Sequence, residues 1–231
     1  ILARALNAHT AELREFLDRE RFFTGDVSHE LRTPLMVIMG AAEILLENSK
    51  DAAARAPAER IYRAAQEATE CITVLLTLAR APEIGQFAPV AVSEIARREV
   101  DRYQPMVASK PVRLLCSGDA DISVRAPAEL CASAVANLIR NACQYTEQGT
   151  VTVVLEPGRV IVEDTGPGLP DAVQQTLGQI SIAIPSSGSA GTGLGLSLVK
   201  RICEYLGATL AYENRAGGGS RFSITFPPGF T

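Results

Sequence analysis

A histidine and a glutamate stand side by side at positions 29 and 30, inside the run DVSHELRTPL of residues 26–35. Histidine is the side chain most easily neutral and nucleophilic near pH 7, and an adjacent carboxylate can orient its ring or take its proton. His29 and Glu30 are therefore a candidate nucleophile and base. An isolated pair of this kind fits a solvated helix surface even better, so the residues elsewhere in the chain must decide.

Asp164 is the second candidate, because it follows a run rich in valine and isoleucine and precedes the residues TGPG. We expect its carboxylate at a strand end, beside a turn with little side-chain bulk at Gly166 and Gly168. Such a place suits a buried acceptor that faces a planar ligand. A plain β-turn is the structural alternative.

Glycines alternate at Gly191, Gly193 and Gly195, directly before a predicted helix. Backbone amides at a helix N-terminus bind phosphate oxygens, and glycine allows their close approach. Asn137 and Asn141, four residues apart, lie on one face of another predicted helix and border its apolar stripe. Amides in such a place are costly unless something pairs with them, although a solvated face is the alternative.

The elements that must position these groups begin with a long helix over residues 1–48, whose apolar residues, Leu31 and Ile38 among them, follow an a/d seam. On this register His29 lies opposite the seam, so a helix that dimerises would present it to solvent. Pro34 predicts a kink one turn later. A second helix with Pro57 near its start completes a hairpin, and two hairpins make a four-helix bundle. An ordinary helical dimer without chemistry is the alternative.

Two prolines and a glycine in residues 81–89 predict a linker. Beyond it, helices and strands mix without regular alternation, which predicts an α+β sandwich. We expect helices over residues 93–103, with Ser93 as N-cap, 128–145 and 197–206, and strands over 113–116, 122–124, 151–155, 160–163, 210–213 and 221–226.

Composition excludes several classes of protein. The chain has 231 residues, 47% of them hydrophobic, and a formal charge of -4, so no basic surface for nucleic acid is expected. Its five cysteines are scattered without C-x-x-C spacing, which argues against a disulfide framework and a zinc site. Because the chain starts at Ile1 in the middle of a pattern, without a methionine, we expect a fragment whose upstream part is missing, and any membrane anchor would lie in that part.

Together, these four motifs resemble the H-box, N-box, G1 box and G2 box of sensor histidine kinases, over about residues 22–227. The resemblance implies a multidomain chain: an all-α helical hairpin that forms a dimeric four-helix bundle, then an α+β sandwich ATP-binding domain of the GHKL (Bergerat) type. The implied domains are a signalling coiled-coil helix over 1–21, the dimerisation and phosphotransfer domain over 22–81, a linker over 82–89 and the catalytic domain over 90–231.

By the same resemblance, His29 accepts the γ-phosphoryl of ATP, Glu30 is its base or orienter, and Thr33 positions water for dephosphorylation of the partner. The implied cofactors are ATP and Mg²⁺, with Asn141 as the metal ligand. The implied partners are a second copy of the chain and the receiver domain of a response regulator. The resemblance also implies a cytoplasmic fragment of an inner-membrane-anchored bacterial sensor, with membrane contact only through an upstream segment. The residues implied to bind nucleotide are Asn137, Asn141, Tyr145, Asp164, Gly166, Gly168, Gly191, Gly193, Leu194 and Gly195.

The sequence departs from the family pattern in two places. Gln144 replaces the usual basic residue three positions after Asn141, and Arg140, one helix turn away, is the candidate that could substitute for it. The F-box phenylalanines are replaced by Leu177 and isoleucines in the spacer expected to cover the nucleotide. These departures permit one alternative, a dimeric regulatory binding module that binds nucleotide but transfers phosphate poorly. A second alternative is a GHKL-type ATPase, which shares the nucleotide motifs and needs no H-box.

Overall fold

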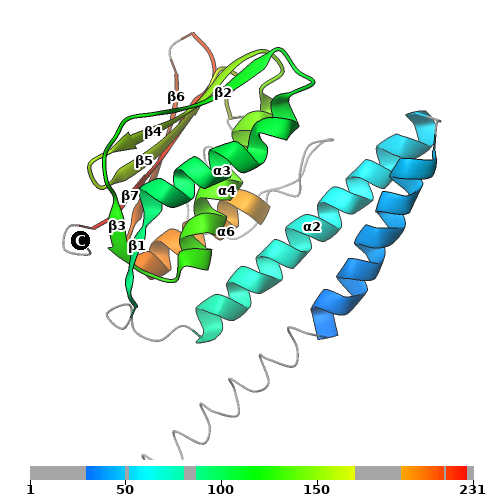
Figure 1. The fold of residues 1–231 in the computed structure, drawn as a ribbon, viewed down its shortest axis with the longest axis horizontal. Helices are drawn as coiled ribbons and strands as arrows, with labels where there is room; N and C mark the ends of the chain where they lie inside the picture. Colours follow the sequence, from blue (N-terminus) through cyan, green and yellow to red (C-terminus); the bar gives the residue numbers. More distant parts are fainter. Residues whose placement is uncertain (1–29, 50–51, 81–86, 170–193, 216, 228–231) are drawn as a thin grey trace, which may run out of the picture. The chain divides into compact units, whose positions relative to one another are not determined.

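The computed structural model describes residues 30–49, 52–80, 87–169, 194–215 and 217–227 (Figure 1). The chain divides into two compact units, Ile1–Ala81 and Pro82–Thr231. The first is helical and the second combines helices with a mixed sheet, so the predicted fold class is confirmed. No helix in the described ranges combines the length and apolar character needed to span a membrane.

The first unit contains a helical hairpin, made of residues 30–48 and helix α2 (Ala52–Arg80) (Figure 1). Arg55 of α2 closes the turn, because its Nη1 donates hydrogen bonds to the carbonyl oxygens of Leu46, at 2.7 Å, and Ser49, at 3.4 Å. These carbonyls lie at the end of the first helix, where they lack intrahelical donors. Pro57 lies inside α2, near its start as predicted.

Most of the buried residues of this hairpin are small. Ala42 and Ala58 are 1% exposed and Ala65 is 5% exposed, and the larger Val74 is 3% exposed. Larger apolar side chains of the same two helices remain exposed to solvent, notably Leu31, Met36, Val37, Ile38, Ile44, Leu45 and Ile61. A hairpin of one chain therefore leaves an apolar surface uncovered.

The second unit is a two-layer sandwich in which helices cover one face of a five-stranded sheet (Figure 1). The strand order is β2-β4-β5-β7-β6, with β2 parallel to β4 and the other pairs antiparallel. Alternate residues of β4, from Val151 to Leu155, are buried toward the helices. The strands are β2 (Val112–Ser117), β4 (Gly149–Glu156), β5 (Arg159–Asp164), β6 (Thr209–Asn214) and β7 (Ser220–Thr225), and the helices are α3 (Val92–Val107), α4 (Ala128–Tyr145) and α6 (Leu194–Leu206).

Two details at the start of this unit differ from prediction. Pro89 is not in a linker but opens strand β1 (Pro89–Ala91), which pairs antiparallel with β3 (Ser123–Arg125). Proline is tolerated there because the strand is short and lies at an edge. Ser93 is not an N-cap, since α3 begins at Val92, and its hydroxyl instead bonds to Asp121 at 3.2 Å.

Lys110 stabilises the C-terminal end of α4 from a distant part of the chain. Its ammonium donates to the carbonyl oxygens of Cys143, Gln144 and Thr146, at 3.3–3.4 Å, and to the carboxylate of Glu147 at 3.1 Å. The last carbonyls of a helix lack backbone donors and carry partial negative charge, which a cation neutralises. Lys110 thus fixes the end of the helix that carries both predicted asparagines.

We expect Lys110→Met to lower the free energy of unfolding of the second unit by about 1 kcal/mol, because the helix carbonyls lose their cation. The measurement is urea unfolding followed by circular dichroism. Glu147→Gln is the matched control: Glu147 is 80% exposed, so loss of its ion pair should cost at most about 0.5 kcal/mol. Equal losses in the two variants would show that the ion pair, and not the capping of α4, stabilises this region.

Candidate functional site

The carboxylate of Asp164 is the buried polar group around which this site is built. Asp164 ends β5 and is 6% exposed. Its Oδ1 accepts hydrogen bonds from the backbone amides of Gly166, at 2.8 Å, and Ser220, at 3.3 Å, and its Oδ2 accepts one from the Ser220 hydroxyl. A carboxylate offers about four acceptor positions. The protein fills only part of this capacity, so Asp164 can still accept a hydrogen bond from a ligand.

Glycines let three segments of the chain meet at Asp164. A Cβ added at Gly166 would lie 3.0 Å from both Asp164 Oδ1 and the carbonyl oxygen of Tyr145, at the end of α4. Gly219 has φ +93°, and its Cβ would lie 2.0 Å from the carbonyl oxygen of Asp164. The ends of β5 and α4 and the turn between β6 and β7 therefore approach one another as closely as bare backbone allows.

The loop after Asp164 is tied to strand β6. The amide of Leu169 donates to the hydroxyl of Tyr212, at 3.2 Å, and to Oδ1 of Asn214, at 3.3 Å. A Cβ added at Gly168 would lie 2.6 Å from the same Asn214 oxygen. The predicted glycine-rich turn is thus held at a defined distance from the sheet edge.

Helix α4 places Asn137, Asn141 and Tyr145 in one row, because each is four residues from the next. At 1.5 Å per residue the row is about 12 Å long. Tyr145 stands at the Asp164 end, 39% exposed, and Asn137 at the other end, beside α6. The row therefore joins the acceptor at Asp164 to the N-terminus of α6.

Asn137 is 1% exposed and its amide is engaged within the protein. Its Nδ2 donates to the carbonyl oxygen of Ser133 at 2.8 Å, and its Oδ1 accepts from Arg140 Nη2. A Cβ added at Gly195 would lie 2.8 Å from the same Oδ1. Asn137 and Gly195 together bring the first turn of α6 against α4.

Asn141 differs from Asn137, because its half-buried side chain has no hydrogen-bond partner among the described residues. Its amide oxygen is therefore available to a cation. The described residues contain no cluster of three or more histidine, cysteine or carboxylate groups that could hold a metal ion. A site with one protein oxygen fits Mg²⁺ bound mainly by the phosphates of a ligand and by water.

The charge missing at Gln144 is not restored by Arg140. Arg140 is 8% exposed and directs its guanidinium at Asn137, inside the unit. The expectation that Arg140 could supply this charge is therefore wrong, because its hydrogen bond to Asn137 holds the guanidinium inside the unit. Gln144 itself is half-buried, and its carbonyl oxygen accepts from Lys110.

The remaining predicted residues are only partly visible. Glu30 opens the described part of the first helix and is exposed, as is Thr33 one turn later. Leu194 is the first residue of α6. His29, Gly191 and Gly193 lie outside the described residues, as does the spacer that carries Leu177.

Two residues of this site were not identified from the sequence. Ser220 supplies two of the donors to Asp164, and Arg215 donates through Nη1 to the Asp164 carbonyl oxygen at 2.9 Å. Both come from the β6–β7 turn, more than 50 residues further along the chain. The sequence contains one signal that could have identified this segment: three glycines at positions 217–219, which predict a backbone turn immediately before a serine.

The cysteines take no part in the chemistry of this site. All five are free, and three of them, Cys131, Cys143 and Cys203, are buried on α4 and α6. Burial raises the pKa of Cys131 and of Cys203 to about 12 and that of Cys143 to about 11. These thiols stay protonated at neutral pH and act as packing groups.

Several curated proteins are similar to this chain over most of its length. Sensor protein QseC of Salmonella typhi is 32% identical over 225 residues, which cover 94% of this chain and 50% of that protein. Sensor protein BasS of Escherichia coli (strain K12) is 33% identical over 220 residues, covering 91% and 59%. The chain spans about half the length of the curated relatives it matches.

Solved structures show the same arrangement of elements. The cytoplasmic segment of histidine kinase QseC superposes with a TM-score of 0.51 at 25% identity, over 70% of this chain and 93% of that one. Full-length ShkA in complex with AMPPNP gives a TM-score of 0.56 at 24% identity, over 90% and 46%, and supports the fold alone.

Two family models match successive parts of the chain. Residues 19–84 match the His Kinase A (phospho-acceptor) domain. Residues 127–229 match the histidine kinase-, DNA gyrase B- and HSP90-like ATPase. The order of these two domains, together with the similarity to QseC and BasS, shows that the chain belongs to the sensor histidine kinases.

Proposed function

We propose that this chain is the kinase core of a sensor histidine kinase, which transfers the γ-phosphoryl of ATP to His29 and then to an aspartate of a response regulator. The observation that carries the proposal is the buried Asp164 carboxylate, held by Gly166 and Ser220 with acceptor capacity left over. A rigid acceptor at the edge of a sheet selects a ligand that presents a donor in a fixed place, as the exocyclic amine of adenine does.

The rest of the nucleotide would follow the row of side chains on α4. Tyr145 would contact the base beside Gly166 and Gly168, and Asn141 would give its amide oxygen to Mg²⁺. Asn137 sets α6 in place, so that the amides of Gly191, Gly193, Leu194 and Gly195 can bind the phosphates at the helix N-terminus. The row is about 12 Å long, the scale of an extended adenine nucleotide.

In the transfer step, a ring nitrogen of His29 would attack the γ-phosphorus in line, and the bond to the bridging oxygen of ADP would break. Glu30 would accept or orient the ring proton. Bound Mg²⁺ would neutralise the phosphate charge, a task that Gln144 cannot share. The phosphoryl group then passes to the regulator aspartate, and Thr33, exposed one turn from His29, would position water for the reverse dephosphorylation.

A second copy of the chain is the occupant that we propose for the uncovered apolar surface of the hairpin. Leu31 and Ile38, on the predicted seam, are each 43% exposed, and Met36 and Val37 are 63% and 67% exposed. Burial of such residues between two hairpins would complete a four-helix bundle. We place this core on the cytoplasmic side of a membrane-anchored sensor, in keeping with its similarity to the cytoplasmic segment of QseC.

Phosphorylation of His29 can be tested directly, because the chain has only two histidines and His9 provides a matched control. With γ-labelled ATP and Mg²⁺, we expect acid-labile, alkali-stable label in the parent chain and in His9→Gln, and none in His29→Gln. Nucleotide binding without label in the parent would favour the regulatory binding module. ATP hydrolysis that continues unchanged in His29→Gln would favour a GHKL-type ATPase.

The role of Asp164 can be tested by Asp164→Asn, which keeps an acceptor for the Gly166 amide but removes the negative charge. We expect ATP affinity to fall about 10- to 100-fold, as for the loss of a hydrogen bond to a charged group. Isothermal titration calorimetry measures the change, and Asp121→Asn, in the loop before β3, is the control. ATP affinity within about twofold of the parent in Asp164→Asn would contradict the proposed adenine site.

A further inference from the structure

The turn between β6 and β7 folds back over Asp164 and is closed by its own backbone. The amide of Arg215 donates to the carbonyl oxygen of Gly219 at 3.0 Å. The amide of Gly218 donates to the carbonyl oxygen of Arg215 at 3.1 Å. Ser220, the next residue after Gly219, supplies the two donors to the Asp164 carboxylate. The position of the carboxylate therefore depends on where this turn sits relative to β5.

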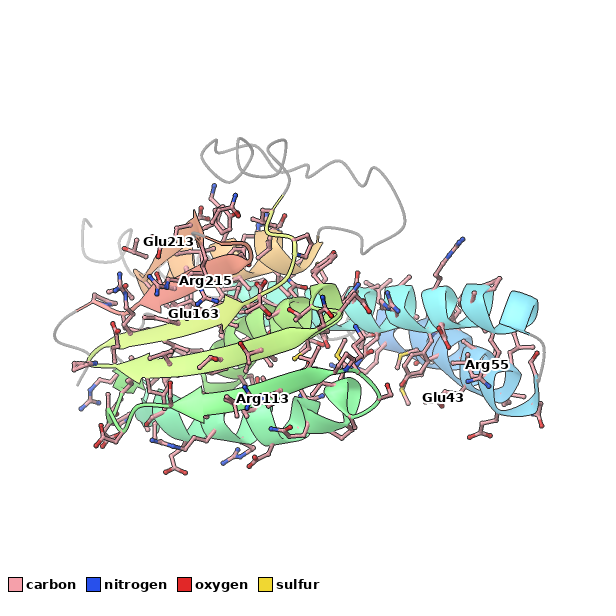
Figure 2. All side chains as sticks on the ribbon, turned by 90° about the horizontal axis from the view of Figure 1, so that it is seen from above. Glu43, Arg55, Arg113, Glu163, Glu213 and Arg215 are labelled. Carbon is pink, nitrogen blue, oxygen red and sulfur yellow. The ribbon has the colours of Figure 1, made fainter. Side chains whose placement is uncertain are left out.

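Arg215 joins the turn to β5 through two acceptors. Its Nη1 donates to the Asp164 carbonyl oxygen at 2.9 Å, and its Nη2 lies 3.5 Å from Oε2 of Glu163. Figure 2 shows Glu163 and Arg215 close together on the sheet, with Glu213 nearby. Because the guanidinium is planar and its donors form a fixed fork, Nη1 and Nη2 of one side chain hold the two acceptors in a defined geometry.

A second arginine shares the same carboxylate without touching Asp164. Arg221 donates to Oε1 of Glu163 through Nε at 2.6 Å and to Oε1 of Glu213 through Nη1 at 2.6 Å. These bonds raise the pKa of the Arg221 guanidinium. Two carboxylates and two guanidinium groups balance in this cluster, so it presents little net charge to the phosphates of a nucleotide.

We propose that Arg215 is a positioning residue for base recognition: by bridging Glu163 and the backbone of Asp164, it fixes the turn that delivers Ser220 to the Asp164 carboxylate. The inference rests on the proposed function, because it assigns Arg215 to the same adenine site. It acts through Asp164 on the base and not through charge on the phosphates. Loss of the Arg215 side chain should therefore weaken the binding of adenosine and of ATP by the same factor.

The test compares Arg215→Met with Arg221→Met in the full chain, since both variants remove a partner of Glu163 and only the first breaks the contact with Asp164. We expect Arg215→Met to lower the affinity for adenosine, for ADP and for ATP by the same factor, about fivefold. Arg221→Met should stay within about twofold of the parent for all three ligands. Titration calorimetry gives the affinities, and thermal unfolding followed by circular dichroism gives the stability of each variant.

The rate of His29 labelling separates positioning from general damage. At saturating ATP we expect the labelling rate of Arg215→Met to be within about twofold of the parent. The ATP concentration needed for the half-maximal rate should rise instead, because only binding is weakened. Unchanged affinity in Arg215→Met would overturn the inference, and so would a loss that grows from adenosine to ATP, which indicates direct phosphate contact. An equal loss in Arg221→Met would reduce the effect to the stability of the cluster.

Failure of this inference can be told apart from failure of the proposed function. If Asp164→Asn weakens ATP binding and Arg215→Met does not, only the role of Arg215 is overturned. If Asp164→Asn leaves ATP affinity unchanged, the adenine site itself is wrong, and the inference falls with it.

Discussion

A carboxylate that leaves water must be given hydrogen-bond donors by the protein, because an unpaired buried charge costs several kcal/mol or more. Asp164 meets this constraint with donors from Gly166, two residues further along the chain, and from Ser220, 56 residues further along. The strand end, the glycine-rich loop and the β6–β7 turn must therefore all be in place at once. The fold of the second unit can be understood as the scaffold that satisfies this one group and leaves part of it open.

Helix α4 connects that group to the other end of the site. Its Asn137 holds the first turn of α6 through the close approach of Gly195, and its C-terminal carbonyls are stabilised by Lys110. The part of α4 from Asn137 to Tyr145 is thus held at both ends by residues that are remote in sequence. Asn141, between the two anchors, is left with an amide oxygen that nothing in the described part of the chain uses. This rigid row between two fixed ends suits the binding of an extended ligand with little rearrangement.

Local patterns in the sequence were sufficient for most of the secondary structure. Helix α4 occupies the predicted residues, because apolar periodicity and the following turn mark both its ends. The β4–β5 hairpin turns at Gly158, with φ +68°, and α6 ends before Gly207, with φ +62°, as the glycines predicted. Strand β1 was not predicted, because proline usually interrupts a strand. Pro89 can be recognised as part of an edge strand only when the pairing of β1 with β3 is known.

The site was predicted less completely, for a different reason. Motif residues such as Asp164 and Asn141 are recognisable where they stand, whereas Ser220 and Arg215 matter only because tertiary folding brings them to Asp164. The internal engagement of Asn137 and the burial of Arg140 likewise follow from the packing of α6, which no local pattern contains. Residues whose role is to hold a motif residue in place through a tertiary hydrogen bond are therefore the ones that local sequence patterns do not predict.

The most direct test of this account is a crystal structure of the chain with AMPPNP and Mg²⁺. We expect the exocyclic amine of adenine to donate to the Asp164 carboxylate while Gly166 and Ser220 keep their hydrogen bonds to it, and Asn141 to coordinate the magnesium ion. A nucleotide bound with its base away from Asp164, or a carboxylate that must leave Ser220 to reach the base, would contradict the claim that this acceptor is built in advance.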